Sequence, residues 1–143
     1  MLVATANETL YAGTLCGGAV RSDNGGENWR AVNLGLKDLE VLTLVQVSAD
    51  ESLYAGTLSG GVFRSDDGGA SWRASNQGLT DLKVLTLMMG AENKGLYAGT
   101  GAGVFHSEDG GVNWRAANVG LEDVAVRTLI AGPKNEGLYA GAF

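Results

Sequence analysis

Proline, cysteine and histidine are almost missing from this sequence, since its 143 residues include one of each. A single cysteine excludes a disulfide framework within the chain. Cys16 stands where Ser59 stands in a second copy of the same segment, so we expect it to be a small packing residue. No group of residues has metal-ligand spacing, and the glycine pairs precede hairpins rather than helices, which excludes a phosphate-binding loop. We therefore expect no metal site and no bound cofactor.

Charge runs and long apolar runs are missing as well. The net charge is −6, and acidic and basic residues are interspersed along the chain, which excludes the basic surface typical of proteins that bind nucleic acids or anionic membranes. No apolar stretch is long enough to cross a bilayer, and the opening MLVATANETL lacks the basic flank and long apolar core of a signal peptide. We expect a soluble chain with no nucleic-acid or membrane partner, in a compartment that the sequence leaves undetermined.

Glycine is abundant, with 23 residues, and the glycines recur at the same places in three copies of one segment. The copies begin at Leu10, Leu53 and Leu96, and a fourth begins at Leu138 and runs to Phe143. The nearly equal spacing of these leucines, roughly 40 residues, is the length of one supersecondary unit. A unit of this size cannot bury its own faces, so the copies must stack on one another.

Each copy predicts four short strands, because its apolar runs are brief and are separated by glycine, Asn and Asp. In the second copy these strands are residues 41–46, 53–57, 61–64 and 72–75. Helix is a poor alternative, since no segment keeps a 3.6-residue apolar period for ten residues without interruption. Four strands in about 40 residues predict the blades of a β-propeller. Ala55 and Gly56 then let inner strands approach closely, while Trp72 fills the wider outer gap between blades.

The predicted fold class is all-β: propeller blades of four antiparallel strands, about three blades per chain, in a ring that is closed by oligomerisation. One repeat domain covers residues 1–143. Its blades are approximately residues 1–36, 37–79 and 80–121. The tail, residues 122–143, carries the first two strands of a further blade, and the first of these strands is expected at residues 124–130.

A segment of fixed pattern lies between the third and fourth strands of each copy. It reads SDNGGENW from Ser22, SDDGGASW from Ser65 and SEDGGVNW from Ser107. An Asp or Asn at the third position can accept hydrogen bonds from turn amides, the glycines allow unusual backbone angles, and the indole anchors the hairpin between sheets. These segments resemble Asp-box repeats, whose pattern is SxDxGxxW. The positions that match it, with Asn24 as the one departure, are Ser22, Asn24, Gly26, Trp29, Ser65, Asp67, Gly69, Trp72, Ser107, Asp109, Gly111 and Trp114.

The whole chain resembles Asp-box (BNR-like) propellers of the sortilin, photosystem-assembly-factor and xyloglucanase type, through its LYAGT and GGVFRS runs and the NxGL that follows. It resembles sialidases less, because its arginines recur once per blade and only Arg127 stands alone. In families with Asp-boxes these turns lie at the blade periphery, which implies a structural role. The alternative is a ladder of polar pairs that binds calcium or acts as acid and base. The pairs would be Asp23 with Asn24, Asp66 with Asp67 and Glu108 with Asp109.

Glycoside hydrolysis needs two carboxylates across a cleft. The best candidates are Asp38, Asp81 and Asp123, which precede the innermost strand of a blade and are expected at a mouth of the ring. Because every repeat has one of them, repeat symmetry is the simpler explanation, and a catalytic pair would break that symmetry. His106 occupies an arginine position and is expected at the surface. We therefore expect no catalysis, and these aspartates would contact a ligand only in a binding module.

Three blades are too few for a closed propeller, which has about four to eight. Two copies of the chain give a six-bladed ring with two-fold symmetry, and this homodimer is favoured over a seven-bladed ring. The expected function is a non-catalytic scaffold or binding module whose partner is another copy, with a glycan or protein ligand also considered. Two alternatives stay open. One is a carbohydrate-binding or glycoside-hydrolase-like propeller with its site at the pore mouth, and the other is a fragment or amplified-blade intermediate without activity.

Overall fold

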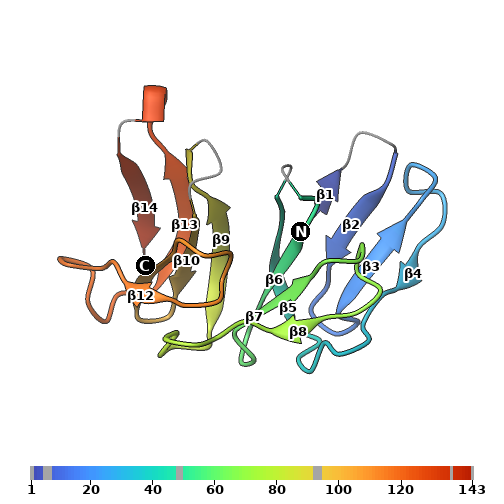
Figure 1. Ribbon diagram of the computed structural model, residues 1–143, viewed down its shortest axis with the longest axis horizontal. Helices are drawn as coiled ribbons and strands as arrows, with labels where there is room; N and C mark the ends of the chain where they lie inside the picture. Colours follow the sequence, from blue (N-terminus) through green and yellow to red (C-terminus); the bar gives the residue numbers. More distant parts are fainter. Residues whose placement is uncertain (1, 5–7, 48–49, 92–94, 136, 143) are drawn as a thin grey trace.

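Three four-stranded antiparallel sheets and one two-stranded sheet make up the computed structural model (Figure 1). The structure describes residues 2–4, 8–47, 50–91, 95–135 and 137–142. Blade 1 contains β1 (Leu2–Ala4), β2 (Leu10–Gly13), β3 (Ala19–Ser22) and β4 (Arg30–Ala31); blade 2 contains β5 (Val41–Gln46), β6 (Leu53–Thr57), β7 (Val62–Ser65) and β8 (Arg73–Ala74); blade 3 contains β9 (Val84–Met89), β10 (Leu96–Thr100), β11 (Gly103–Ser107) and β12 (Arg115–Ala116). A half-blade follows, formed by β13 (Val126–Ala131) and β14 (Leu138–Ala142) with a 3-10 turn at Pro133–Asn135 between them. The all-β fold class and the count of about three blades per chain are confirmed.

The first two strands predicted for blade 2 match β5 and β6 residue for residue, whereas the outer two shift or shorten. Gly61 has a φ of +80°, a left-handed conformation that does not fit a strand, so β7 begins one residue later. The amide of Trp72 donates to the carbonyl oxygen of Leu34 in blade 1, which leaves only Arg73–Ala74 for β8. Asp123, with a φ of +58°, lies in a turn, and β13 accordingly begins at Val126 rather than at residue 124.

The first strand of each blade packs against the first strand of the next, as β1, β5, β9 and β13 lie in sequence along one side of the arc. The glycine of each LYAG segment permits this close approach. A Cβ atom added to Gly13 would lie 2.6 Å from Cγ1 of Val41, and one added to Gly56 would lie 2.6 Å from Cγ1 of Val84. The prediction that small residues let the inner strands approach is confirmed.

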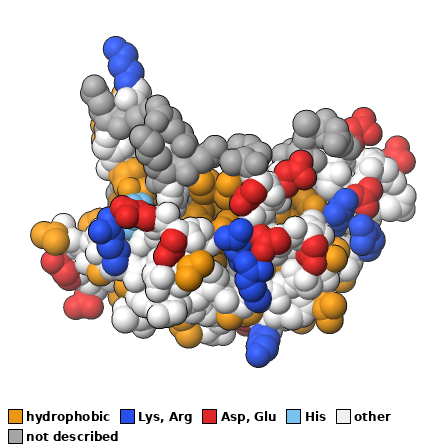
Figure 2. All heavy atoms as spheres, viewed as in Figure 1, with side chains coloured by type: hydrophobic (Ala, Val, Ile, Leu, Met, Phe, Trp, Pro, Cys, Tyr) orange, Lys and Arg blue, Asp and Glu red, His pale blue; other side chains and the backbone are white. Residues whose placement is uncertain are grey.

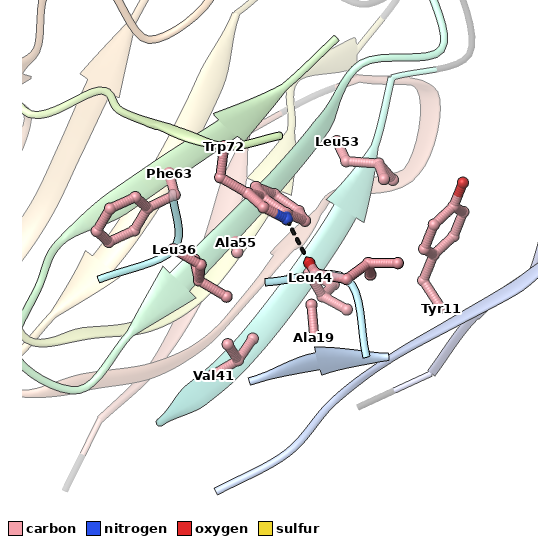
Figure 3. Close-up of a cluster of buried hydrophobic side chains, with 10 residues drawn as sticks. Tyr11, Ala19, Leu36, Val41, Leu44, Leu53, Ala55, Phe63 and Trp72 are labelled. Carbon is pink, nitrogen blue, oxygen red and sulfur yellow. Dashed lines mark hydrogen bonds between the residues drawn. The ribbon is translucent and has the colours of Figure 1, made fainter. Parts of the chain in front are cut away.

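The apolar core lies between blades rather than inside any one of them. One buried cluster joins Tyr11 and Ala19 of blade 1 to Leu44, Phe63 and Trp72 of blade 2 (Figure 3). A second cluster joins blades 2 and 3 in the same way. Burial of apolar surface is the main stabilising term in folding, so the blades depend on one another for stability. Among the described residues, no helix is long and apolar enough to cross a membrane.

Candidate functional site

The serine of each SxDxGxxW segment closes its own turn, which we call the Ser–Asx turn. In blade 2 the buried hydroxyl of Ser65 donates to Oδ1 of Asp67 at 2.8 Å and accepts from the amide of Gly69 at 2.9 Å. Blades 1 and 3 repeat both bonds through Ser22 and Ser107. Gly69 has a φ of +89°, which glycine adopts without strain. The turn is therefore specified locally by side chains that satisfy its own backbone.

The third residue of the turn also bonds forward along the chain. Oδ1 of Asp67 accepts from the amide of Ser71 at 2.8 Å, and Asp109 accepts in the same way from Asn113 at 2.8 Å. Asn24 reproduces the bond with its carboxamide oxygen and the amide of Asn28 at 3.0 Å, so a carboxylate is not required. The backbone and side chain of Asn113, with the hydroxyl of Ser107, lower the pKa of Asp109 to about 2. The hydrogen bonds of the turn therefore stabilise the carboxylate forms of Asp67 and Asp109.

The acid that precedes each Asx residue pairs with arginines of its own blade. In blade 2, Asp66 contacts Nε of Arg64 at 2.8 Å and Nη1 of Arg73 at 2.6 Å. Partial burial raises the pKa of Asp66, but hydrogen bonds from Arg64, Arg73 and Ser52 outweigh it and lower the pKa to about 2. Asp23 and Glu108 occupy the same position and also pair with arginine. A carboxylate engaged in this way is a poor general acid.

The tryptophans join successive blades. The indole nitrogen of Trp72 donates to the carbonyl oxygen of Val32 at 2.7 Å, and that of Trp114 donates to Ser75 at 2.7 Å. Figure 3 shows the first of these bonds crossing from blade 2 to blade 1. Trp72 and Trp114 are 6% and 5% exposed, whereas Trp29 of blade 1 is 42% exposed. The expected role of Trp72 in filling the gap between blades is confirmed, and it depends on a preceding blade.

A tyrosine and an arginine of each of the first two blades bind the turn of the following blade. The hydroxyl of Tyr54 and Nη1 of Arg64 both donate to the carbonyl oxygen of Gly110, at 2.9 and 3.0 Å. Tyr11 and Arg21 bind Gly68 in the same way. Each arginine also lies over the ring of its tyrosine, with the Arg64 guanidinium carbon 5.4 Å from the ring centre of Tyr54. Both residues recur at one spacing in the repeat, and this recurrence is the sequence signal that could have identified the contact.

Blade 3 differs at this position, because His106 replaces the arginine. Its ring stacks on Tyr97 at a centroid distance of 4.2 Å, and Nη2 of Arg115 lies 3.3 Å from its Nδ1. The expectation that His106 is a surface residue is wrong, since it is 8% exposed. A planar imidazole stacks flat on the tyrosine ring and is covered by it. Its Nε2 atom is buried without a hydrogen-bond partner in the part of the chain that the structure describes.

The three aspartates predicted at the pore mouth occupy different local settings. Asp38 accepts from the amides of Ser59 and Gly60 at 2.8 and 2.9 Å, so it ties the loop before blade 2 to the hairpin of that blade. Burial raises the pKa of Asp38, but bonds from Glu40, Ser59 and Gly60 lower it overall. Asp81 accepts from the amide of Lys83 at 3.0 Å, and Asp123 is exposed in the loop before β13. The three aspartates occupy the same position in the repeat, but the structure gives them different hydrogen bonds.

A pocket of about 240 Å³ lies on blade 1, lined by Arg21, Asp23, Asn24, Asn28, Trp29 and Arg30. It lies beside Trp29, whose counterparts are covered by a preceding blade. Acidic and basic side chains are mixed across the face seen in Figure 2. No group of three or more His, Cys, Asp or Glu residues that could hold a metal ion occurs within the described residues.

Residues 3–129 match a family model described as the DUF6242 beta propeller domain. No curated protein sequence matches the chain significantly.

Three solved structures with a similar fold have low sequence identity to the chain, and the chain covers less than half of each of them. The extracellular domain of BT4673 from B. thetaiotaomicron has a TM-score of 0.80 at 16% identity, over 97% of this chain and 19% of that one. The GH74 xyloglucanase from Xanthomonas campestris has a TM-score of 0.72 at 22% identity, over 98% and 26%. YCF48 bound to D1 peptide has a TM-score of 0.67 at 18% identity, over 99% and 46%. The chain therefore spans from about a fifth to less than half of these proteins, and the likeness shows a shared propeller fold.

Proposed function

The chain belongs to the DUF6242 β-propeller domain family, and we propose that it is a non-catalytic scaffold or binding module that closes its ring with a second copy. Three blades and a half-blade leave two apolar faces without a neighbouring blade. A ring of six blades from two copies would cover both faces, and it lies within the usual range of four to eight blades.

This proposal rests on an observation in the half-blade. Its strand β14 repeats the LYAG sequence of β6, yet Tyr139 is 59% exposed where Tyr54 is 2% exposed. The same side chain is buried wherever a complete blade follows. Tyrosine supplies a large apolar area for burial, so a face with these residues exposed favours association.

The absence of catalysis is part of the proposal. The acids of the Ser–Asx turns are engaged by arginines, hydroxyl groups and turn amides, and Asp38 is engaged by Ser59 and Gly60. We assign the turns as Asp-boxes that act as structural elements. If the assembled ring binds a ligand, the names of its structural neighbours favour a glycan or a peptide, to be tested at the mouth formed near Asp38, Asp81 and Asp123.

The test is the mass of the full chain in solution, by light scattering over a range of concentrations. The expected result is a dimer with twice the 14.7 kDa mass of one chain. A seven-bladed ring of two copies would have the same mass, and negative-stain images viewed along the ring axis distinguish six blades from seven. A chain that keeps the mass of one copy at all concentrations would contradict the proposal and favour the fragment without activity.

A further inference from the structure

Two loops of the chain receive a tryptophan from the following blade. We call residues 33–36 and 76–79 receiving loops, and residues 118–121 are the corresponding loop of blade 3. Leu34 accepts the backbone amide of Trp72, and Gln77 accepts that of Trp114, both at 2.8 Å. A Cβ atom added to Gly35 would overlap the carbonyl oxygen of Trp72. The glycine of a receiving loop is thus required by the tryptophan that packs on it.

The third receiving loop has the same sequence pattern but no tryptophan packed on it among the described residues. Gly120 keeps a φ of +89°, and an added Cβ atom would meet nothing within 4 Å. Val119 is 99% exposed. Nearby, the hydroxyl of Tyr97 has no hydrogen bond within the described part of the chain, whereas Tyr11 and Tyr54 bind the glycine of the next turn. Loop 118–121 therefore retains the features of a receiving loop.

Blade 1 has the complementary surface. Its Ser–Asx turn is formed as in the other blades, and its Trp29 is 42% exposed because no receiving loop packs on it in the described part of the chain. We propose, building on the ring in the proposed function, that Trp29 of one copy docks on receiving loop 118–121 of the other. By analogy with the two complete joints, its backbone amide binds the carbonyl oxygen of Val119, its indole nitrogen binds that of Ala117, and Tyr97 binds the carbonyl oxygen of Gly25.

This docking places the outer strands of blade 1 beside β14 of the partner copy. In each complete blade the LYAG strand pairs with the third strand, as Ala12 of β2 pairs with Val20 of β3. We assign β13 and β14 to the inner half of the shared blade, in place of β1 and β2. β13 and β14 pair at five positions and β1 and β2 at three, and Val126 of β13 already packs against Gly99 of blade 3. The shared blade then has four strands from two copies.

Substitutions on the two sides of the proposed joint test the docking. Gly120 has a φ of +89°, and no atom lies within 4 Å of an added Cβ. Gly120→Ala strains the backbone of one copy and also obstructs an incoming tryptophan, whereas Trp29→Ala removes the tryptophan without backbone strain. We expect both substitutions to weaken dimerisation by about 100-fold or more, measured by analytical ultracentrifugation.

The outcomes separate the two proposals. If Gly120→Ala dimerises like the wild type, the docking of Trp29 is wrong and the ring itself stands. If Gly120→Ala weakens dimerisation but Trp29→Ala does not, backbone strain explains the effect and the docking is again wrong. If the wild type is monomeric at all concentrations, both proposals fail.

A disulfide experiment tests the strand exchange, in full-length protein carrying Cys16→Ser. We expect Val20→Cys combined with Ala140→Cys to give a covalent dimer on non-reducing gels after mild oxidation, because Ala140 takes the place of Ala12 beside Val20. Val20→Cys combined with Ala12→Cys is the control and should oxidise poorly. An efficient bond within one chain in the control, with no covalent dimer from the first pair, would overturn the exchange.

Discussion

The indole nitrogen of Trp72 donates a 2.7 Å hydrogen bond to the carbonyl oxygen of Val32, which lies in the preceding blade and 40 residues earlier in the chain. Both groups are buried, so the bond is shielded from water. It fixes the outer part of one blade on the outer part of another, where the gap between sheets is widest. Because Trp114 repeats the contact with Ser75, the joint belongs to the repeat and not to one pair of residues.

Trp72→Phe should lower the free energy of unfolding by about 1–3 kcal/mol, because the carbonyl oxygen of Val32 loses its partner while most of the ring volume stays. Urea denaturation followed by circular dichroism measures this. Trp29→Phe is the control, and at concentrations where the chain is monomeric it should change the free energy by less than about 0.5 kcal/mol. Equal effects from the two substitutions would contradict the role of the joint.

Asp67→Asn should leave stability almost unchanged, whereas Asp67→Ala should cost about 1–2 kcal/mol. The carboxamide of Asn24 already makes the corresponding bond to a turn amide in blade 1, so an amide oxygen is sufficient at this position. Alanine leaves the amide of Ser71 and the hydroxyl of Ser65 without this acceptor. A large loss with Asn would show instead that the turn needs a negative charge, as a cation-binding ladder would.

Stability should fall as the pH drops from about 4 to about 2. The pKa of Asp66 is lowered from 3.8 to about 2 in the folded chain, so its contribution is fully present above the unfolded value and is lost on protonation of the folded state. Urea midpoints at pH 2, 3, 4 and 6 measure the change. Asp66→Asn should give a shallower pH dependence than the wild type over this range. An unchanged slope would show that its arginine contacts do not stabilise the fold.

Asp38→Ala should destabilise the chain by about 1–2 kcal/mol, because the amides of Ser59 and Gly60 lose their acceptor. Asp123→Asn is the control, since Asp123 is exposed and asparagine tolerates its φ of +58°, and it should change stability by less than about 0.5 kcal/mol. Thermal unfolding followed by circular dichroism compares the two. If neither substitution affects stability but both abolish glycan or peptide binding by the ring, the binding role of these residues is supported over a structural one.

The repeat made most of the fold predictable. The alternation of short apolar runs with glycine identified β5 and β6 to the residue, and the count of blades followed from the spacing of Leu10, Leu53 and Leu96. The serine and Asx residues of the turn were also found, because their hydrogen bonds are local. Blade limits at the predicted boundaries, the ring and a ligand at the pore mouth stay predictions.

Contacts between blades were harder to predict. The bonds of Arg64 and Tyr54 to Gly110 join residues about 46 and 56 positions apart, so no local pattern describes them. His106 was predicted at the surface because it occupies an arginine position in the repeat, but it is buried and stacks on Tyr97.

The sequence by itself determined the strands, their grouping into blades and the chemistry of each turn, since these depend on residues close together in the chain. The tertiary structure decided which copies of a repeated residue are buried. Trp29, Trp72 and Trp114 occupy the same place in the repeat, but only the latter two have a preceding blade to receive them. Burial depends on a neighbouring blade rather than on residue type, because only a packed neighbour removes a side chain from water.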